Sequence, residues 1–96
     1  MTRNGETGEP TIIKLPYIEL ERGFTPSEWE VQIALEERVI TFMAPLGNVD
    51  DKNKVVYVFE VGRYGDSVFI ELPGEPLNTG RRLEVSRKWL DSIVHR

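Results

Sequence analysis

WEVQIALEERVITFMAPL, residues 29–46, is the stretch that decides the fold, because it can form either one capped helix or two paired strands. Residues 25–28, Thr-Pro-Ser-Glu, match a capping box with Pro at the first helical position, and apolar residues recur at helical spacing. Residues 39–42 favour a strand, because they are β-branched and aromatic residues that lose rotamer freedom in a helix. Local preferences alone leave residues 26–44 open to both structures.

Pairing of the apolar residues favours the hairpin. Folding the stretch about Glu37 and Arg38 leaves one face mixed and more polar, as expected for an antiparallel pair with one solvated side. The turn is the weak part of this prediction, because neither Glu37 nor Arg38 takes a positive φ easily. In this hairpin Trp29 is a core or pocket-lining residue. The other face carries four apolar pairs: Leu35 with Ile40, Ile33 with Phe42, Val31 with Ala44, and Trp29 with Leu46.

A second hairpin is predicted in KVVYVFEVGRYGDSVFIELPG, residues 54–74. Two β-branched and aromatic runs flank a turn-like stretch, residues 63–66, whose Gly65 can take positive φ. A one-residue slip would turn every side chain to the other face, so the alignment of apolar residues predicts the register. Reversal about Tyr64 and Gly65 places seven apolar residues on one face: Val55, Tyr57, Phe59, Val61, Val68, Ile70 and Leu72.

The segment before the first hairpin contains a change of side-chain parity. Ile13 and Leu15 lie on one parity, whereas Ile18 and Leu20 lie on the other, and Pro16 stands where the parity changes. Because Pro cannot donate a backbone hydrogen bond, it is confined to strand edges and bulges. We therefore expect a bulge or a corner on an edge strand here.

The C-terminal part is predicted to contain loops, one strand and one helix. Residues 48–53 and 73–80 are rich in Asn, Asp, Pro and Gly, as loops are, and residues 82–85 can form a short strand. Ser86 then caps a helix from Arg87 to about His95. The apolar stripe of this helix consists of Trp89, Leu90, Ile93 and Val94.

These elements predict an α+β, mainly antiparallel β protein. We expect a sheet of five to seven strands, strongly curved or closed into a small barrel, with one C-terminal helix across a face or an open end. With 96 residues, of which 40% are apolar, the chain suits one globular domain over residues 11–96, preceded by a flexible tail over residues 1–10. Any part of the second sheet face that the helix leaves bare would be a site for a second subunit, giving a homodimer. The expected seat of the helix on that face is formed by Val39, Met43, Val56, Val58 and Phe69.

Composition excludes several classes of function. The sequence has no Cys, which excludes disulfides, thiolate metal sites and a cysteine nucleophile. The apolar runs at residues 39–46 and 55–58 are short of the roughly 18 residues of a membrane helix, so we expect no membrane association and a cytoplasmic location. His95 is the single His, and residues 48–53 lack the spacing and the Gly of a calcium loop. We therefore predict no catalytic residues, no metal site and no cofactor.

Two groups of residues are candidate binding sites. Arg63 and Tyr64 lie at the predicted turn, and Arg and Tyr are common anchors of protein interfaces, although Tyr64 could instead fold back over its hairpin. The second group lies around the junction of the last strand and the helix, where a phosphate or an acidic partner would be its ligand. Pairing of these cations with the acidic body is the favoured alternative, since residues 1–80 carry 7 Lys and Arg against 14 Asp and Glu. The second group consists of Arg81, Arg82, Arg87 and Lys88.

Function is predicted less sharply than fold. We expect a small acidic, non-enzymatic binding module that contacts a protein partner or holds a small ligand in its curved sheet, with a pocket lined by Trp29, Tyr57 and Phe59. One alternative is a nucleic-acid-associated accessory protein that uses the basic C-terminal segment, which the acidic body disfavours. Another alternative is a small enzyme of an unfamiliar type. A carboxylate inside the predicted pocket would support this alternative.

Overall fold

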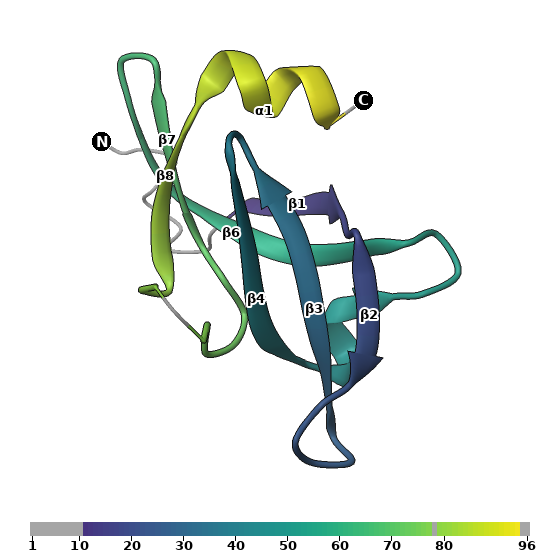
Figure 1. The fold of residues 1–96 in the computed structure, drawn as a ribbon. Helices are drawn as coiled ribbons and strands as arrows, with labels where there is room; N and C mark the ends of the chain where they lie inside the picture. The colour runs from purple at the N-terminus through teal and green to yellow at the C-terminus, as the bar shows by residue number, and fades with distance from the viewer. Residues whose placement is uncertain (1–10, 78, 95–96) are drawn as a thin grey trace.

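The structure, a computed structural model, describes residues 11–77 and 79–94, which form two antiparallel sheets and one C-terminal α-helix (Figure 1). One sheet has the order β1-β6-β7-β8, with β5 also paired to β6, and the other has the order β2-β3-β4. The predicted α+β, mainly antiparallel class is confirmed; the sheets curve around a common core but do not close into a barrel. The predicted tail, residues 1–10, and His95 lie outside the described residues. The elements are β1 (Thr11–Pro16), β2 (Glu19–Arg22), β3 (Glu28–Leu35), β4 (Arg38–Pro45), the 3-10 turn η2 (Leu46–Asn48), β5 (Val49–Asp50), β6 (Val55–Tyr64), β7 (Ser67–Glu71), β8 (Arg82–Ser86) and α1 (Arg87–Ile93).

Residues 29–46 form the predicted hairpin, as strands β3 and β4, and not a helix. Its register differs from the prediction, because Leu35 pairs with Arg38, so the turn residues are Glu36 and Glu37. The whole ladder is displaced by two residues, an even number, and the predicted face is therefore still the buried one. Leu46 lies beyond the end of β4, in η2, instead of opposite Trp29. The buried inner residues of the hairpin are Val31, Ile33, Leu35, Ile40, Phe42 and Ala44.

The turn of this hairpin carries a local strain that a substitution can test. Glu36 has φ 55°, in the left-handed region, which costs a residue with a side chain about 1–2 kcal/mol. Glu36→Gly is expected to raise the free energy of unfolding by about 0.5–1 kcal/mol, less than the full strain because Gly also loosens the unfolded chain. The matched variant Glu37→Gly, at a position without positive φ, should lower it by a similar amount. Urea denaturation of both variants measures the difference, and equal effects at the two positions would contradict this account of the turn.

Strands β6 and β7 form the second predicted hairpin, but its register and one of its faces were predicted wrongly. Tyr64 pairs with Ser67, so the turn residues are Gly65 and Asp66, and the ladder shifts between Glu60 and Gly62. This bulge reverses the side-chain parity of β6, because one extra residue is inserted on that strand. The predicted face is buried on β7 and just after it, at Val68, Ile70 and Leu72. On β6 the buried residues are Val56 and Val58, whereas the prediction had placed Tyr57, Phe59 and Val61 in the core.

The predicted corner is present at the end of β1. Ile13 and Leu15 are buried on the inner face of the five-stranded sheet, and β1 ends at Pro16. The Tyr17 backbone N–H donates to the carbonyl of Lys54, whereas that of Ile18 donates to the carbonyl of Gln32 on β3. The chain therefore leaves one sheet and enters the other within these residues.

Helix α1 closes one end of the space between the sheets, near the β3–β4 turn (Figure 1). Ser86 is its N-cap, as predicted, and its Oγ accepts a hydrogen bond of 3.1 Å from the backbone N–H of Trp89. Leu90 is buried in the common core, with the rest of the predicted stripe packed around it. The predicted seat of the helix was wrong: the β6 bulge places Val56 and Val58 inside the core, and Val39 remains exposed on the outer face.

Residues 73–77 cover part of the free edge of β4. The Met43 backbone N–H donates to the carbonyl of Glu75 over 3.1 Å, and the Leu77 N–H donates to the carbonyl of Thr41 over 3.0 Å. An isolated bridge joins Phe42 to Pro76 between these two bonds. Residues 73–77 thus protect part of a free strand edge, and Met43 on this edge is buried although its side chain belongs to the outer face.

Candidate binding groove

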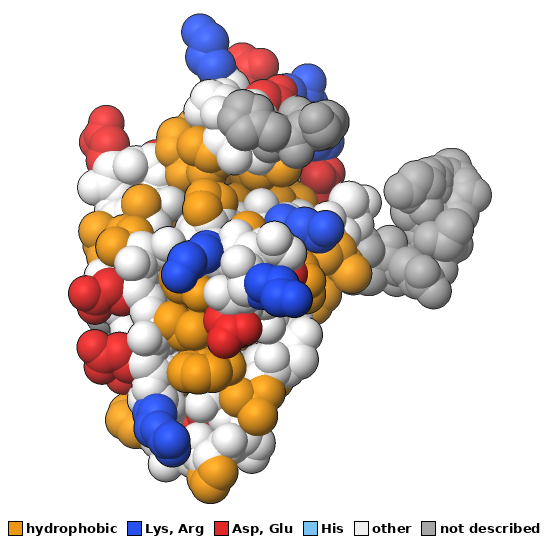
Figure 2. Space-filling view, turned by 90° about the vertical axis from the view of Figure 1, so that its right-hand side faces the viewer, with side chains coloured by type: hydrophobic (Ala, Val, Ile, Leu, Met, Phe, Trp, Pro, Cys, Tyr) orange, Lys and Arg blue, Asp and Glu red, His pale blue; other side chains and the backbone are white. Residues whose placement is uncertain are grey.

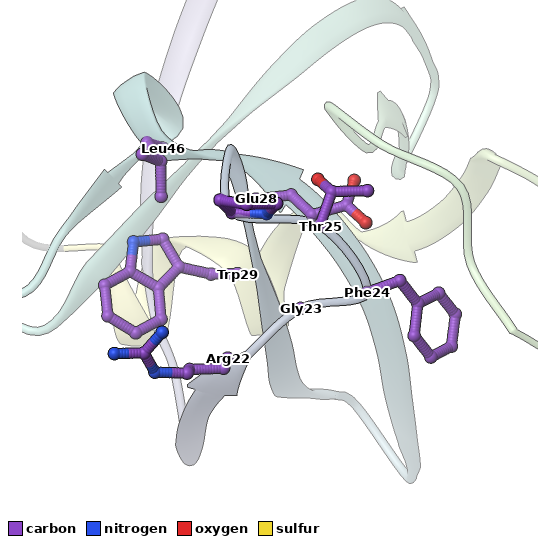
Figure 3. A pocket seen from close by; sticks show the side chains of 8 residues that line it. Arg22, Gly23, Phe24, Thr25, Glu28, Trp29 and Leu46 are labelled. Carbon is purple, nitrogen blue, oxygen red and sulfur yellow. The ribbon is translucent and has the colours of Figure 1, made fainter.

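A groove of about 390 Å³ lies at the end of the molecule opposite α1, where β2, β3 and η2 meet (Figure 3). Figure 2 shows hydrophobic side chains reaching down to this lower end of the molecule, with charged side chains beside them. The two ends of the space between the sheets therefore differ, since a helix covers one and a short loop borders the other. The residues that line the groove are Arg22, Gly23, Phe24, Thr25, Pro26, Glu28, Trp29 and Leu46.

The loop between β2 and β3 is held tightly at its base. The Gly23 backbone N–H donates to the carbonyl of Glu28 over 3.1 Å, and the Ser27 N–H donates to Oγ1 of Thr25 over 3.3 Å. A Cβ at Gly23 would lie 2.6 Å from Cγ and 2.7 Å from the carbonyl oxygen of Glu28, so only glycine fits. The loop consequently displays Phe24, which is 77% exposed.

Trp29 forms the floor of the groove. It pairs with Arg22 on β2 and Ala44 on β4, and it shares its inward parity with the buried Val31. Because it is the last inward residue before the sheet ends, it packs against the core on one side and remains half-buried. In Figure 3 its indole lies between the side chains of Arg22 and Leu46.

The rim of the groove carries one charge of each sign. Arg22 is exposed and Glu28 is half-buried. Within residues 11–77 and 79–94, neither side chain forms an ion pair. Both charges are therefore available to a partner, beside an apolar floor.

The three residues of the predicted pocket do not come together in this groove. Trp29 lines it, but Tyr57 and Phe59 are half-buried on the outer face of the five-stranded sheet, where they pair with Lys14 and Ile12 on β1. The β6 bulge is the physical reason, since it turns these two rings away from the core. Phe24, Arg22 and Glu28 were not among the predicted site residues. The signal in the sequence was an aromatic residue after Gly23 within a polar turn.

The two residues predicted at the β6–β7 turn have different environments. Nε of Arg63 lies 2.6 Å from Oε2 of Glu60, and this hydrogen bond raises the pKa of Arg63. Tyr64 is 81% exposed, so its ring stands out from the hairpin and does not fold over it. Of this pair, Tyr64 remains a candidate contact point, whereas Arg63 already has a partner.

The four cations near the last strand and the helix also divide into two pairs. Arg82 forms an ion pair of 3.1 Å with Glu71, and Arg81 lies 3.9 Å from Glu71 and from Glu75. These two pair with the acidic body, as the alternative prediction proposed. Arg87 and Lys88 instead line a separate hollow next to Asp66, and the buried Nε of Arg87 has no hydrogen-bond partner.

Asp50 orders the loop of residues 48–53, which lacks the spacing of a calcium loop. Its carboxylate accepts hydrogen bonds from the side chain and backbone of Asn53 and from the backbone of Lys52, and these bonds lower the pKa of Asp50. Across the described part of the chain there is no group of three or more His, Cys, Asp or Glu side chains that could hold a metal ion. The loop is explained by its own hydrogen bonds.

Removal of the Asn53 side chain tests this role of Asp50. Asn53→Ala is expected to raise the pKa of Asp50 toward the ordinary value of 3.8. A lowered carboxyl pKa stabilises the fold above the unfolded-state pKa, and that stabilisation is lost as the pH falls through the folded-state pKa. Stability should therefore fall less on acidification in the variant than in the wild type. An NMR titration of the side-chain carboxyl carbon measures the pKa; Asn48→Ala is the control, and an unchanged pKa in Asn53→Ala would refute the assignment.

The fold and the groove define a small antiparallel α+β protein with an apolar recess at an open end. Compared with protein-family models, curated proteins and solved structures, the chain gives no match. Among residues 11–77 and 79–94, no helix has the length and apolar character needed to cross a membrane.

Proposed function

We propose that this protein is a non-enzymatic binding module that receives an apolar side chain of a protein partner in the groove above Trp29. One observation carries the proposal: the half-buried Trp29 and the 47% exposed Leu46 line an apolar recess at one open end, and the loop beside it displays Phe24, which is 77% exposed. Singly exposed apolar side chains are normal on soluble proteins, whereas apolar groups clustered in a recess mark contact surfaces.

The residue types of the groove support a protein partner. Trp and Arg are enriched among the residues that dominate binding energy, and Trp29 and Arg22 lie side by side here. Interfaces also combine an apolar centre with a polar rim, which Arg22 and Glu28 supply. Full burial of one Leu or Phe side chain contributes about 1.5–3 kcal/mol, so one anchoring residue of the partner changes the affinity by about ten- to a hundredfold.

Selection from a displayed library of random peptides tests the proposal. At protein concentrations low enough to prevent self-association, selected peptides are expected to share an aromatic or aliphatic anchor. Leu46→Ser should weaken their binding at least about tenfold, which corresponds to about 1.4 kcal/mol. The control is Leu77→Ser, since Leu77 is the same residue type with a similar exposed fraction but lies outside the groove. Failure to select any peptide, or equal binding by both variants, would overturn the proposal.

The salt dependence of binding and the positions of the charged and aromatic residues distinguish this function from the two alternatives. Binding to nucleic acid would fall steeply between low and moderate salt, whereas binding in an apolar groove responds little. Arg81 and Arg82 already pair with carboxylates, which leaves Arg87 and Lys88 for phosphate contacts. A catalytic pocket would have combined a carboxylate with Trp29, Tyr57 and Phe59, and the latter two lie elsewhere. The cytoplasmic location stays a prediction.

A further inference from the structure

We infer that the groove is occupied by a second copy of this chain, in a two-fold contact in which each copy inserts Phe24 into the groove of the other. This inference rests on the proposed function of the groove and names its partner. It accounts for the joint presence of a projecting aromatic ring and an apolar recess on the same end of the molecule.

Phe24 is placed to reach another molecule. Its ring points away from Trp29 and Leu46 on the far side of the loop backbone (Figure 3), so it does not fill the groove of its own chain. The hydrogen bond from Gly23 to Glu28 and the steric constraint at Gly23 hold the loop in this orientation. An exposed aromatic ring on a short, braced loop loses little conformational freedom when it docks.

The recess has room for this ring. An apolar cavity of about 150 Å³ is large enough to bind benzene, and the groove measures about 390 Å³. Trp29 and Leu46 offer the apolar contacts, and aromatic rings pair favourably in offset or edge-to-face arrangements. The inserted ring therefore finds both space and matching chemistry.

The charges on the rim suit a two-fold arrangement. In a contact of this symmetry every pairing occurs twice, and a surface must be complementary to itself. Arg22 and Glu28 have opposite signs and line the same groove, and neither has an ion-pair partner within the described residues. Arg22 of one copy can therefore face Glu28 of the other, on both sides of the axis.

Sedimentation equilibrium on the full chain over a range of concentrations tests the inference. We expect a reversible dimer for the wild type and for the control Leu77→Ser, and at least a tenfold weaker association for Phe24→Ser. Arg22→Glu should also weaken the dimer, and the double variant Arg22→Glu/Glu28→Arg should restore it to within threefold of the wild type. A wild type that is monomeric throughout, or a dimer that Phe24→Ser leaves unchanged, would overturn the inference.

Disulfide trapping adds a geometric readout, because the chain has no native Cys. Phe24→Cys mixed with Leu46→Cys should form a mixed disulfide under mild oxidation, whereas Phe24→Cys mixed with Val39→Cys should not, since the exposed Val39 lies outside the groove. Equal trapping of both mixtures would contradict the two-fold exchange. If the chain is monomeric but selected peptides still bind in a Leu46-dependent way, this inference fails and the proposed function stands. If neither occurs, both fail.

Discussion

Replacement of Phe42 by Ala is expected to lower the free energy of unfolding by about 3–5 kcal/mol, the range for a fully buried Phe. Phe42 has no exposed surface and is the largest of the fully buried side chains among the described residues. On β4 it pairs with Val31, and its backbone bridges to Pro76, so its ring lies where the three-stranded sheet meets the common core. Truncation removes apolar contacts on all sides and leaves a cavity that the surrounding strands can fill only in part.

Phe24→Ala is the matched control for this prediction. The chemical change is identical, but Phe24 is mostly exposed in the monomer. Its loss should therefore change the free energy of unfolding by no more than about 0.5 kcal/mol when the protein is dilute. Guanidinium denaturation of both variants gives the comparison. Similar losses for the two substitutions would mean that the core does not lie between the sheets as described.

Gly74→Ala is expected to cause a loss of about 2–4 kcal/mol, through overpacking together with weakened hydrogen bonds. A Cβ at this position would overlap the carbonyl oxygen of Met43 and lie 2.6 Å from its carbonyl carbon. These are backbone atoms of β4, so residues 73–77 have to move away from the strand. That movement disturbs the bonds from Met43 to Glu75 and from Leu77 to Thr41.

Hydrogen exchange and a second glycine test this prediction. The amides of Met43 and Leu77 should lose protection in Gly74→Ala, along with the global loss of stability. Gly80→Ala is the control, because a Cβ at Gly80 meets nothing within 4 Å, and its effect should stay within about 0.5 kcal/mol. A Gly74→Ala variant as stable as Gly80→Ala would show that residues 73–77 do not pack against β4.

The inner face of the first hairpin was predictable because alternation of apolar residues reports side-chain parity directly. Its register was not, because parity is unchanged by a shift of two residues and the choice then depends on the turn. The two-residue turn places Glu36 at positive φ, a conformation that Glu adopts only when the surrounding strands impose it. Matching apolar residues across the hairpin led to the prediction that Leu46 pairs with Trp29, but Leu46 lies beyond the end of β4.

In the second hairpin, one inserted residue made the predicted orientation of the β6 side chains wrong. The ladder shift next to Gly62 turns Tyr57 and Phe59 outward and Val56 and Val58 inward. A glycine within a strand is a known sign of a bulge, so Gly62 was the available signal. Trp29 therefore does not meet Tyr57 and Phe59, since the predicted pocket relied on the unbroken parity of β6.

The groove was predictable from the sequence only in part. Trp29 stood out in the sequence as an apolar residue at the end of a strand, where it faces either the core or a pocket. Phe24 lies in a loop, where no periodicity reports orientation, and its relation to Trp29 appears only once β2 and β3 are paired. The β2–β3 loop is thus the part of the candidate site that strand patterns do not predict.

The two tryptophans offer the most direct test of the groove as the contact surface, because Trp29 lines the groove and Trp89 lies on α1 at the other end of the molecule. The measurement is the position of the two indole N–H resonances in ¹H–¹⁵N NMR spectra as the protein concentration is raised. The account predicts a concentration-dependent shift of the Trp29 resonance, a constant Trp89 resonance, and no shift of either in Phe24→Ser. A Trp29 resonance that stays fixed while Trp89 moves, or two resonances that never move, would contradict it.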